Sequence, residues 1–341
     1  MKYLNDYRKD FDLDRFINYG SKVTQLSVLS QHESRLKVGD EKLPKIRLEW
    51  QTNGEAGTKS EVFDAVCIAN GHYAQPSFPD LEGMGNFRGK TIHSIEYDNP
   101  ECFAGETVLC IGGRASGADV AREISQHASH VYLSDSTADT AETQGSVTCV
   151  PRAVSVDADG CCSFANDCSV RPKVDTIIFC TGYDYQFPFI NDESNLELSV
   201  TPGERRIMPL YKQLWHADLP NLSFIGLPHS VLPFPLFELQ VEAFVQQILL
   251  GGNELPGRTE RREKAQVDAV TGGSSKNGRV KDTHHLGSAQ WDYCRELAQI
   301  AHVYDDDMEQ YIATNRVSFQ QRLPYMMWNC RHVNSYILVV F

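Results

Sequence analysis

The chain has 341 residues, and its formal net charge is −13 because 45 aspartate and glutamate residues outnumber 32 lysine and arginine residues. This length accommodates two domains, while an acidic chain without a basic tract disfavours nucleic acid as a partner. The ten cysteines include no C-x-x-C pair and no accompanying histidine cluster, which argues against a metal site and a disulfide framework and favours a reduced, cytoplasmic protein.

The N-terminal segment favours one helix followed by two strands. Apolar residues at roughly helical spacing predict a helix from Tyr3 to Ile17, and strands are expected near Lys22–Ser27 and Ile46–Trp50. The segment is charged from its first residues and lacks the apolar core of a secretory signal. We therefore expect the protein to remain inside the cell.

A buried strand over residues 63–69 ends directly in Asn70, Gly71, His72 and Tyr73. In doubly wound sheets, ligands bind at the carboxyl ends of the strands. Asn70 is therefore a candidate for contact with a cofactor. Alternatively, Asn70 and Gly71 only supply the unusual backbone angles of a turn.

A glycine-rich turn between a strand and a helix is the strongest local motif. The apolar run Thr107–Ile111 predicts a buried strand, GGRASG follows it, and a helix is expected up to Ile124. Glycines let the backbone approach a pyrophosphate, and the helix N-terminus favours its negative charge. Ser116 is the expected helix cap, and Asp119 is expected in the first turn. The candidate cofactor-binding residues are Gly112, Gly113, Arg114, Ala115, Ser116, Gly117 and Asp119.

Arg114 departs from the pattern G-x-G-x-x-G, because it occupies the position of the middle glycine. Its side chain either adds a positive charge over the phosphates or points to solvent. The whole turn also has a simpler interpretation, a strand-to-helix connection that binds no phosphate.

The next strand, His130–Leu133, is followed by an acidic residue that bears on cofactor choice. Asp135 lies close to the position, about 20 residues past the glycines, at which a carboxylate binds the ribose of a dinucleotide. An acidic residue there favours the free 2′-hydroxyl of NADH. Alternatively, Asp135 is a solvated turn residue.

The second half of the chain mixes regular and irregular segments. Residues 137–171 predict a small β-extension with a hairpin turn at Asp159 and Gly160. Residues 256–287 are rich in glycine, serine and charge and predict a mobile loop. Its His284 and His285 lack partners for a metal.

The apolar end of the chain, YILVVF, follows neither a helix nor a strand pattern and predicts an irregular terminus. A membrane span needs about 20 apolar residues, and this stretch, like every other apolar stretch of the chain, is shorter. We therefore expect no membrane span.

Several segments resemble the flavin-containing monooxygenase (FMO) family. The family signature F-x-G-x-x-x-H-x-x-x-Y is matched by Phe87, Gly89, His93 and Tyr97. A tyrosine at the last position, as Tyr97 is here, resembles the N- and S-oxygenating members. VCIANGHY, VDTIIFCTGY, NLSFIGLPHSVLPFPLFELQVEAFVQQIL and QWDYC also resemble family segments, and GGRASGAD resembles the loop of the plant-type S-oxygenating members. The resemblance extends from Met1 to about Asp307.

The resemblance implies an α/β fold with two dinucleotide-binding (Rossmann-like) domains. Residues 102–171 would form an NAD(P)H-binding domain inserted into an FAD domain made of residues 1–101 and 172–341. The cofactors would be FAD and NADPH, with NADH as an alternative. The reaction would use O2 to oxygenate a soft nitrogen or sulfur nucleophile of a small molecule, as in N,N-dimethylaniline monooxygenases.

Residue roles implied by the resemblance concern the cofactors, because these carry the hard chemistry. Asn70 becomes the candidate catalytic residue beside the flavin. His93 and Tyr97 would hold the connection between the domains. The cofactor contacts would extend to Asp135, Thr181, Gly182 and Gln240.

One unit of the family has no counterpart before Gly112, namely the strand, G-x-G-x-x-G turn and helix that begin the FAD site. We therefore expect an FAD domain whose N-terminal βαβ unit is missing. Such a chain would bind flavin weakly, purify colourless and be inactive in this form. The alternative is a non-catalytic pyridine-nucleotide-binding remnant or interaction protein. A flavin-dependent disulfide reductase is less favoured, because its C-x-x-x-x-C redox pair is absent.

Overall fold

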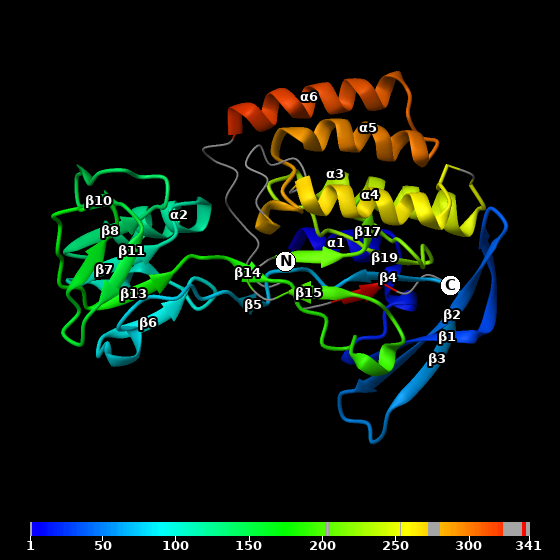
Figure 1. The fold of residues 1–341 in the computed structure, drawn as a ribbon, viewed down its shortest axis with the longest axis horizontal. Helices are drawn as coiled ribbons and strands as arrows, with labels where there is room; N and C mark the ends of the chain where they lie inside the picture. Colours follow the sequence, from blue (N-terminus) through cyan, green and yellow to red (C-terminus); the bar gives the residue numbers. More distant parts are fainter. Residues whose placement is uncertain are drawn as a thin grey trace.

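The computed structural model of the chain has two lobes joined by a narrow connection (Figure 1). It describes residues 2–201, 203, 205–252, 254–271, 280–322 and 336–338. The smaller lobe takes its strands from the middle of the chain, and the larger lobe combines the segments before and after them. In the connection, β5 (Gln75–Pro76) pairs antiparallel with β14 (Tyr183–Asp184).

The smaller lobe is built on a six-stranded sheet in the order β6-β13-β7-β8-β10-β9. Its strands pair in parallel, except that β9 and β10 are antiparallel. Both faces of a parallel sheet are covered, so its strands are nearly continuous apolar runs; Leu109 in β7 and Ile177 in β13 are fully buried. The strands are β6 (Lys90–His93), β7 (Thr107–Ile111), β8 (His130–Ser134), β9 (Glu142–Gln144), β10 (Val147–Val150) and β13 (Thr176–Phe179).

A βαβ unit and a hairpin complete this lobe, and both confirm the sequence prediction. Helix α2 (Ala115–Ile124) returns the chain from β7 to β8 and buries Ile124 against the sheet. In the β-extension, β11 (Ala153–Val156) pairs antiparallel with β12 (Cys162–Phe164) across the predicted turn. Gly160 in this turn has a φ of 89°, which a residue without a Cβ adopts at little cost.

The larger lobe contains a five-stranded sheet in the order β17-β18-β19-β4-β20. β4 and β19 run parallel, so their carboxyl ends meet at one edge. Residues 336–338 form a strand antiparallel to β4, which corrects the prediction of an irregular terminus over these three residues; Val339, Val340 and Phe341 lie outside the described residues. The backbone of 336–338 pairs with the edge of β4, a pairing that local sequence does not reveal. The strands are β4 (Val66–Ala69), β17 (Leu210–Tyr211), β18 (Trp215–His216), β19 (Leu222–Phe224) and β20 (Tyr336–Leu338).

Helices α3, α5 and α6 stack above this sheet (Figure 1). Their apolar side chains form a core with the sheet in which Trp215, Leu236, Phe244 and Leu297 are fully buried. A π-helical segment, Val245–Leu249, continues α3. The helices are α3 (Pro233–Phe244), α5 (Gln290–Ile300) and α6 (Asp306–Arg322).

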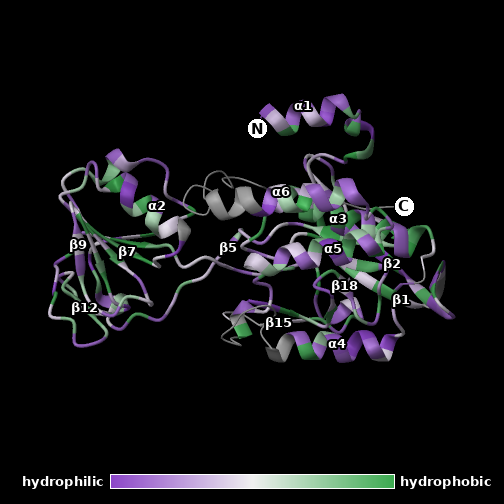
Figure 2. Cartoon of the chain, turned by 90° about the horizontal axis from the view of Figure 1, so that it is seen from above, coloured by the Kyte–Doolittle hydropathy of each residue, from purple (hydrophilic) through white to green (hydrophobic). Residues whose placement is uncertain are grey.

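The N-terminal segment forms a shorter helix and longer strands than the sequence predicts. Helix α1 (Lys2–Asp10) lies on the outside of the lobe (Figure 2), where Tyr3 contacts Phe234 of α3 with 6.2 Å between ring centroids, and none of its residues is buried. Asp12 adopts a left-handed φ of 49°, which interrupts the helix before a 3-10 turn at Leu13–Phe16. An antiparallel sheet follows, made of β1 (Ser21–Val38), β2 (Glu41–Thr52) and β3 (Lys59–Phe63). A smaller hairpin pairs β15 (Ser199–Thr201) with β16 (Arg206–Met208).

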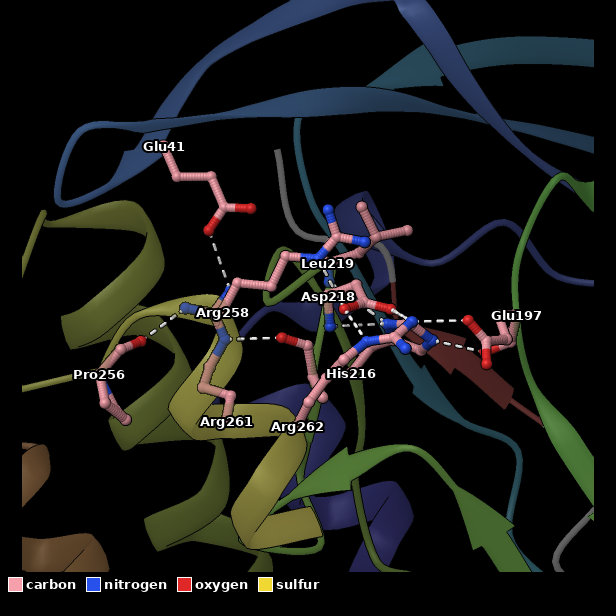
Figure 3. Close-up of polar contacts among 10 residues, drawn as sticks. Glu41, Glu197, His216, Asp218, Leu219, Pro256, Arg258, Arg261 and Arg262 are labelled. Carbon is pink, nitrogen blue, oxygen red and sulfur yellow. Dashed lines mark hydrogen bonds and ion pairs between the residues drawn. The ribbon is translucent and has the colours of Figure 1, made fainter. Parts of the chain in front are cut away.

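Helix α4 (Arg258–Thr271) corrects the prediction of a mobile loop over residues 256–287. Its sequence is polar, but Arg261 is fully buried and donates hydrogen bonds to Ala217 O and Pro256 O, each at 2.7 Å (Figure 3). Arg258 and Arg262 both pair with Asp218. The glycine- and serine-rich residues 272–279 lie outside the described residues.

Candidate functional site

The glycine turn at the end of β7 is packed so closely that two of its positions admit only glycine. Gly112 has a φ of 113°, and a Cβ on it would lie 2.6 Å from Cys180 O. A Cβ on Gly117, in the first turn of α2, would lie 1.7 Å from Gly112 O. The start of α2 therefore rests directly on the turn. The first N–H groups of a helix have no intrahelical partner, so this arrangement suits a pyrophosphate.

Two details of the turn differ from the sequence prediction. Arg114 is the N-cap residue of α2 and makes no side-chain capping bond, so Ser116 lies inside the helix and is not its cap. Asp119 lies beyond the first turn and forms an ion pair with Arg122 at 2.7 Å. The helix starts earlier than expected because Ala115, a strong helix former, already has helical geometry.

Asp135 follows β8 and lies against the glycine turn. A Cβ on Gly113 would lie 2.2 Å from Asp135 Oδ2. The other carboxylate oxygen, Oδ1, accepts hydrogen bonds from the backbone N–H and the hydroxyl of Thr137, each at 2.8 Å. The side chain is therefore fixed by its own turn and also contacts the loop. This position suits a carboxylate that binds a ribose hydroxyl.

The side chain of Arg114 is partly exposed to solvent and also pairs with a residue of the larger lobe. Its side chain is 66% exposed, and Nη2 lies 3.9 Å from Oδ1 of Asp282, whose side chain is 4% exposed. Asp282 ends a 3-10 turn, η6 (Val280–Asp282), which contacts α4 and β16 in the larger lobe. The residue at the position of the middle glycine therefore reaches across to the other lobe.

Asn70 and His72 lie just beyond β4, at the edge where β4 and β19 end together. Asn70 Nδ2 donates a hydrogen bond to Gln186 O at 3.2 Å. His72 stacks edge-on against Tyr185, with 5.3 Å between ring centroids, and its two ring nitrogens are buried without a hydrogen-bond partner among the described residues. Burial lowers the pKa of His72 to about 4, against a smaller opposing effect of the Gly226 backbone, so the ring is neutral at pH 7.

Two further histidines, His229 and His284, lie near His72 and were not among the site residues predicted from the sequence. Tyr185 also stacks edge-on against His284, at 5.3 Å, and the ring of His229 lies 3.0 Å from His284 O. Burial, with the neighbouring histidines, lowers the pKa values of His229 and His284 to about 3. His72 follows Asn70 so closely that sequence could have included it. His284 could not be found, because its segment was predicted to be a mobile loop.

The segment that joins the lobes contains Thr181, Gly182 and His93. Thr181 Oγ1 donates a hydrogen bond to Ser77 O at 2.5 Å, and His93 Nε2 lies 3.1 Å from Gly182 O. Arg205 packs on Gly182 and donates to Thr181 O. These contacts fix the strand end beside the connection between the lobes.

The other family-signature residues and Gln240 make contacts within the protein. Tyr97 donates to Glu123 Oε2 at 2.8 Å, and a Cβ on Gly89 would lie 2.2 Å from the ring of Phe87. Gln240 is fully buried; its Oε1 accepts from Gly226 N at 2.9 Å and its Nε2 donates to Tyr293 at 3.0 Å. Gln240 therefore supports the loop after β19, and both ends of its amide are engaged.

Within the described residues, no group of three or more histidine, cysteine, aspartate or glutamate side chains is arranged to hold a metal ion. Among the described helices, none combines the length and apolar character needed to cross a bilayer.

Comparison with known sequences gives extended matches. The chain matches the family described as Flavin-binding monooxygenase-like over residues 1–141 and 140–310. It is 32% identical over 305 residues to flavin-containing monooxygenase FMO GS-OX-like 4 of Arabidopsis thaliana, covering 87% of this chain and 64% of the relative. FMO GS-OX-like 2 of the same plant is 34% identical over 312 residues, covering 87% and 62%. The chain thus spans a little under two thirds of the length of these relatives.

Comparison with solved structures agrees with these matches. S-allyl-L-cysteine S-oxygenase from Allium sativum superposes with a TM-score of 0.78 at 26% identity, covering 96% of this chain and 72% of that one. Tmm from Pelagibacter sp. superposes with a TM-score of 0.68 at 21% identity, covering 94% and 68%, which shows a common fold. The predicted fold class, an α/β protein with two Rossmann-like domains, is confirmed.

Proposed function

The chain belongs to the Flavin-binding monooxygenase-like family, and from that premise we propose that it serves the NADPH- and FAD-dependent oxygenation by O2 of a small molecule with a soft sulfur nucleophile. A soft nitrogen nucleophile is the second substrate class. FAD and NADPH are the cofactors that the family supports. The cytoplasmic location and the domain limits stay predictions.

The observation that carries the proposal is the pair of glycine contacts at the start of α2. The absence of a Cβ at Gly112 and Gly117 lets a helix N-terminus approach a pyrophosphate without side chains in the way. Asp135 lies against the same turn, where it would bind the adenosine ribose. The residues present therefore fit a pyridine dinucleotide.

The larger lobe offers a matching site for the flavin ring. His72 presents two buried ring nitrogens that make no hydrogen bond of normal geometry among the described residues, although the Gly226 backbone lies near the ring. Buried polar groups are normally hydrogen-bonded. As a neutral imidazole, His72 would offer one donor and one acceptor to the polar edge of a flavin. Asn70 would lie beside it. Bound FAD supplies the redox chemistry with O2, while Tyr185 and the buried histidines keep water away and bring no charge.

We favour a sulfur nucleophile over a nitrogen nucleophile as the substrate because a similar solved protein is an S-oxygenase. The solved neighbour at 26% identity is an S-oxygenase that acts on S-allyl-L-cysteine. The substrate pocket itself is not assigned to residues, so the substrate class rests on this similarity alone.

The test separates nucleotide binding from turnover. NADPH and NADH are titrated against the purified chain. FAD is then added in excess, together with S-allyl-L-cysteine or N,N-dimethylaniline. We expect saturable nucleotide binding and faster formation of the sulfoxide than of the N-oxide. Binding without either product would favour the non-catalytic nucleotide-binding protein. Failure to bind either nucleotide would refute the proposal.

A further inference from the structure

Arg114 and Asp282 form an ion pair between the lobes that involves the nucleotide turn itself. Arg114 is the N-cap residue of α2 in the smaller lobe, and Asp282 belongs to η6 in the larger lobe. Their closest atoms, Nη2 and Oδ1, are 3.9 Å apart. The same turn would hold the pyrophosphate, so nucleotide binding at this turn should affect the ion pair.

The two partners differ in burial. The side chain of Asp282 is 4% exposed, whereas that of Arg114 is 66% exposed. A buried carboxylate requires a cation or several hydrogen bonds to offset its lost hydration. Arg205 is a further cation near the pair and interacts electrostatically with both residues. Its guanidinium already packs on Gly182, donates to Thr181 O and lies 3.9 Å from Asp184.

Arg114 is at the same time the N-cap residue of the helix that would bind the pyrophosphate. Its backbone precedes the first turn of α2, and its long side chain is 66% exposed, so little packed protein surrounds it. Guanidinium groups bind phosphate oxygens through paired, charge-assisted hydrogen bonds. Asp282 and the pyrophosphate would therefore compete for the same guanidinium, whose contact with Asp282 is long, at 3.9 Å.

We propose that Arg114 couples nucleotide binding to the contact between the lobes, by pairing with Asp282 in the nucleotide-free protein and with the pyrophosphate in the bound protein. This inference rests on the proposed function, because it concerns the regulation of the same nucleotide site. Coupling between two binding events is reciprocal. The free energy by which Asp282 weakens nucleotide binding therefore equals the free energy by which the bound nucleotide weakens the ion pair between Arg114 and Asp282.

The experiment is a double-mutant cycle on the full chain, read as the Kd of NADPH. Arg114→Gln should weaken binding about tenfold, the loss of one charge-assisted contact. Asp282→Asn should tighten binding about threefold to tenfold, because Arg114 is released. In the Arg114→Gln background, Asp282→Asn should change nothing.

Matched controls remove the same charges elsewhere. Arg122→Gln removes an arginine of the same helix whose side chain is 63% exposed, and Asp292→Asn removes a paired aspartate of the larger lobe. Both should leave the Kd within about twofold of the parent. Unfolding midpoints of all variants are measured, so that a misfolded variant is recognised.

A second measurement needs no nucleotide. Without Arg114, backbone amides around Asp282, including the bond from His285 N to Asp282 O at 2.9 Å, should exchange hydrogen for deuterium faster, whereas Arg122→Gln should leave them unchanged. Equal exchange in the two variants would refute the pairing.

The outcomes distinguish this inference from the proposed function. If the parent binds NADPH and the effects of the two substitutions are additive, or Asp282→Asn fails to tighten binding, the coupling is wrong and the proposed function stands. If the parent binds neither nucleotide, both are wrong.

Discussion

Gly117 in helix α2 lies so close to Gly112 at the end of β7 that a Cβ on Gly117 would be 1.7 Å from Gly112 O. A contact this short cannot be relieved by a side-chain rotation, because the opposing atom belongs to the backbone. The helix would have to move away from the strand, and with it the N–H groups that face the turn.

We predict that Gly117→Val lowers the affinity for NADPH by at least about tenfold and the free energy of unfolding by about 1–3 kcal/mol, the usual cost of overpacking. Nucleotide titration and urea denaturation measure the two effects. Gly257→Ala is the control, since a Cβ there meets no atom within 4 Å. Parent-like affinity in Gly117→Val would exclude this turn as the nucleotide site.

Asp135 should set the preference between the two nicotinamide cofactors. Its carboxylate lies against Gly113 and is held by Thr137, where it would accept a hydrogen bond from a free 2′-hydroxyl and repel a 2′-phosphate. We predict that NADH competes effectively with NADPH in the parent. Asp135→Arg should shift the ratio of the two Kd values toward NADPH by about tenfold to a hundredfold, the value of one charge-assisted hydrogen bond.

The control for this ratio is Asp139→Arg, which makes the same charge change at an exposed position of the same loop. Competition titrations with both nucleotides give the ratio for each variant. If Asp139→Arg shifts it as much as Asp135→Arg, general charge and not a ribose contact sets the preference.

Local sequence was sufficient for the βαβ unit and the family, because their determinants lie within short segments. The apolar run before Gly112 and the helix after it need no distant partner to be recognised. The signature from Phe87 to Tyr97 is equally local. The candidate site residues remain predictions, although the structure brings Asp135 onto the glycine turn.

Contacts between distant segments were beyond the reach of the sequence. Helix α4 has a polar sequence, and its anchor is Arg261, whose partners Ala217 and Glu41 come from elsewhere in the chain. The pairing of Arg114 with Asp282 joins two lobes. β20 was missed because a strand at a sheet edge is defined by its neighbour, β4, and not by its own pattern.

His284 should make stability depend on pH between about 6.5 and 3. Its Nε2 accepts a hydrogen bond from Ile207 N at 3.1 Å, and its Nδ1 faces Gln213 Oε1 at 3.3 Å. Protonation would place a second N–H against the N–H of Ile207. Burial, together with nearby His229 and His72, lowers the pKa of His284 to about 3. The unfolded chain therefore takes up the proton first, and stability present above pH 6.5 is lost as the pH falls.

We predict that this residue alone accounts for about 2 kcal/mol of the decrease in the free energy of unfolding between pH 7 and pH 5. His284→Gln, which cannot be protonated, should lack that part of the decrease. Urea denaturation followed by tryptophan fluorescence measures it, with His127→Gln, an exposed histidine of the smaller lobe, as the control. An unchanged pH dependence in His284→Gln would contradict the buried, neutral state.

Arg261 and Arg258 lie one turn apart on α4 and should differ strongly in their contribution to stability. Arg261 is fully buried and donates to two backbone carbonyls and to Glu41 Oε2 at 3.1 Å, whereas the side chain of Arg258 is 57% exposed (Figure 3). Burial would raise the pKa of their neighbour Asp218, but hydrogen bonds from Arg262 and Arg258 lower it to about 2. Asp218 thus keeps one arginine when Arg258 is removed, while the partners of Arg261 would have no replacement.

We predict that Arg261→Gln lowers the free energy of unfolding by about 3–5 kcal/mol, the cost of breaking a buried charged network. Arg258→Gln should cost about 1 kcal/mol or less, as exposed pairs do. Urea denaturation gives both values, and proteolysis within residues 258–271 should accelerate only in Arg261→Gln, because only that variant releases the helix. Equal costs would mean that α4 is held by the exposed pairs with Asp218, and that the buried guanidinium contributes no more than an apolar side chain of its size would.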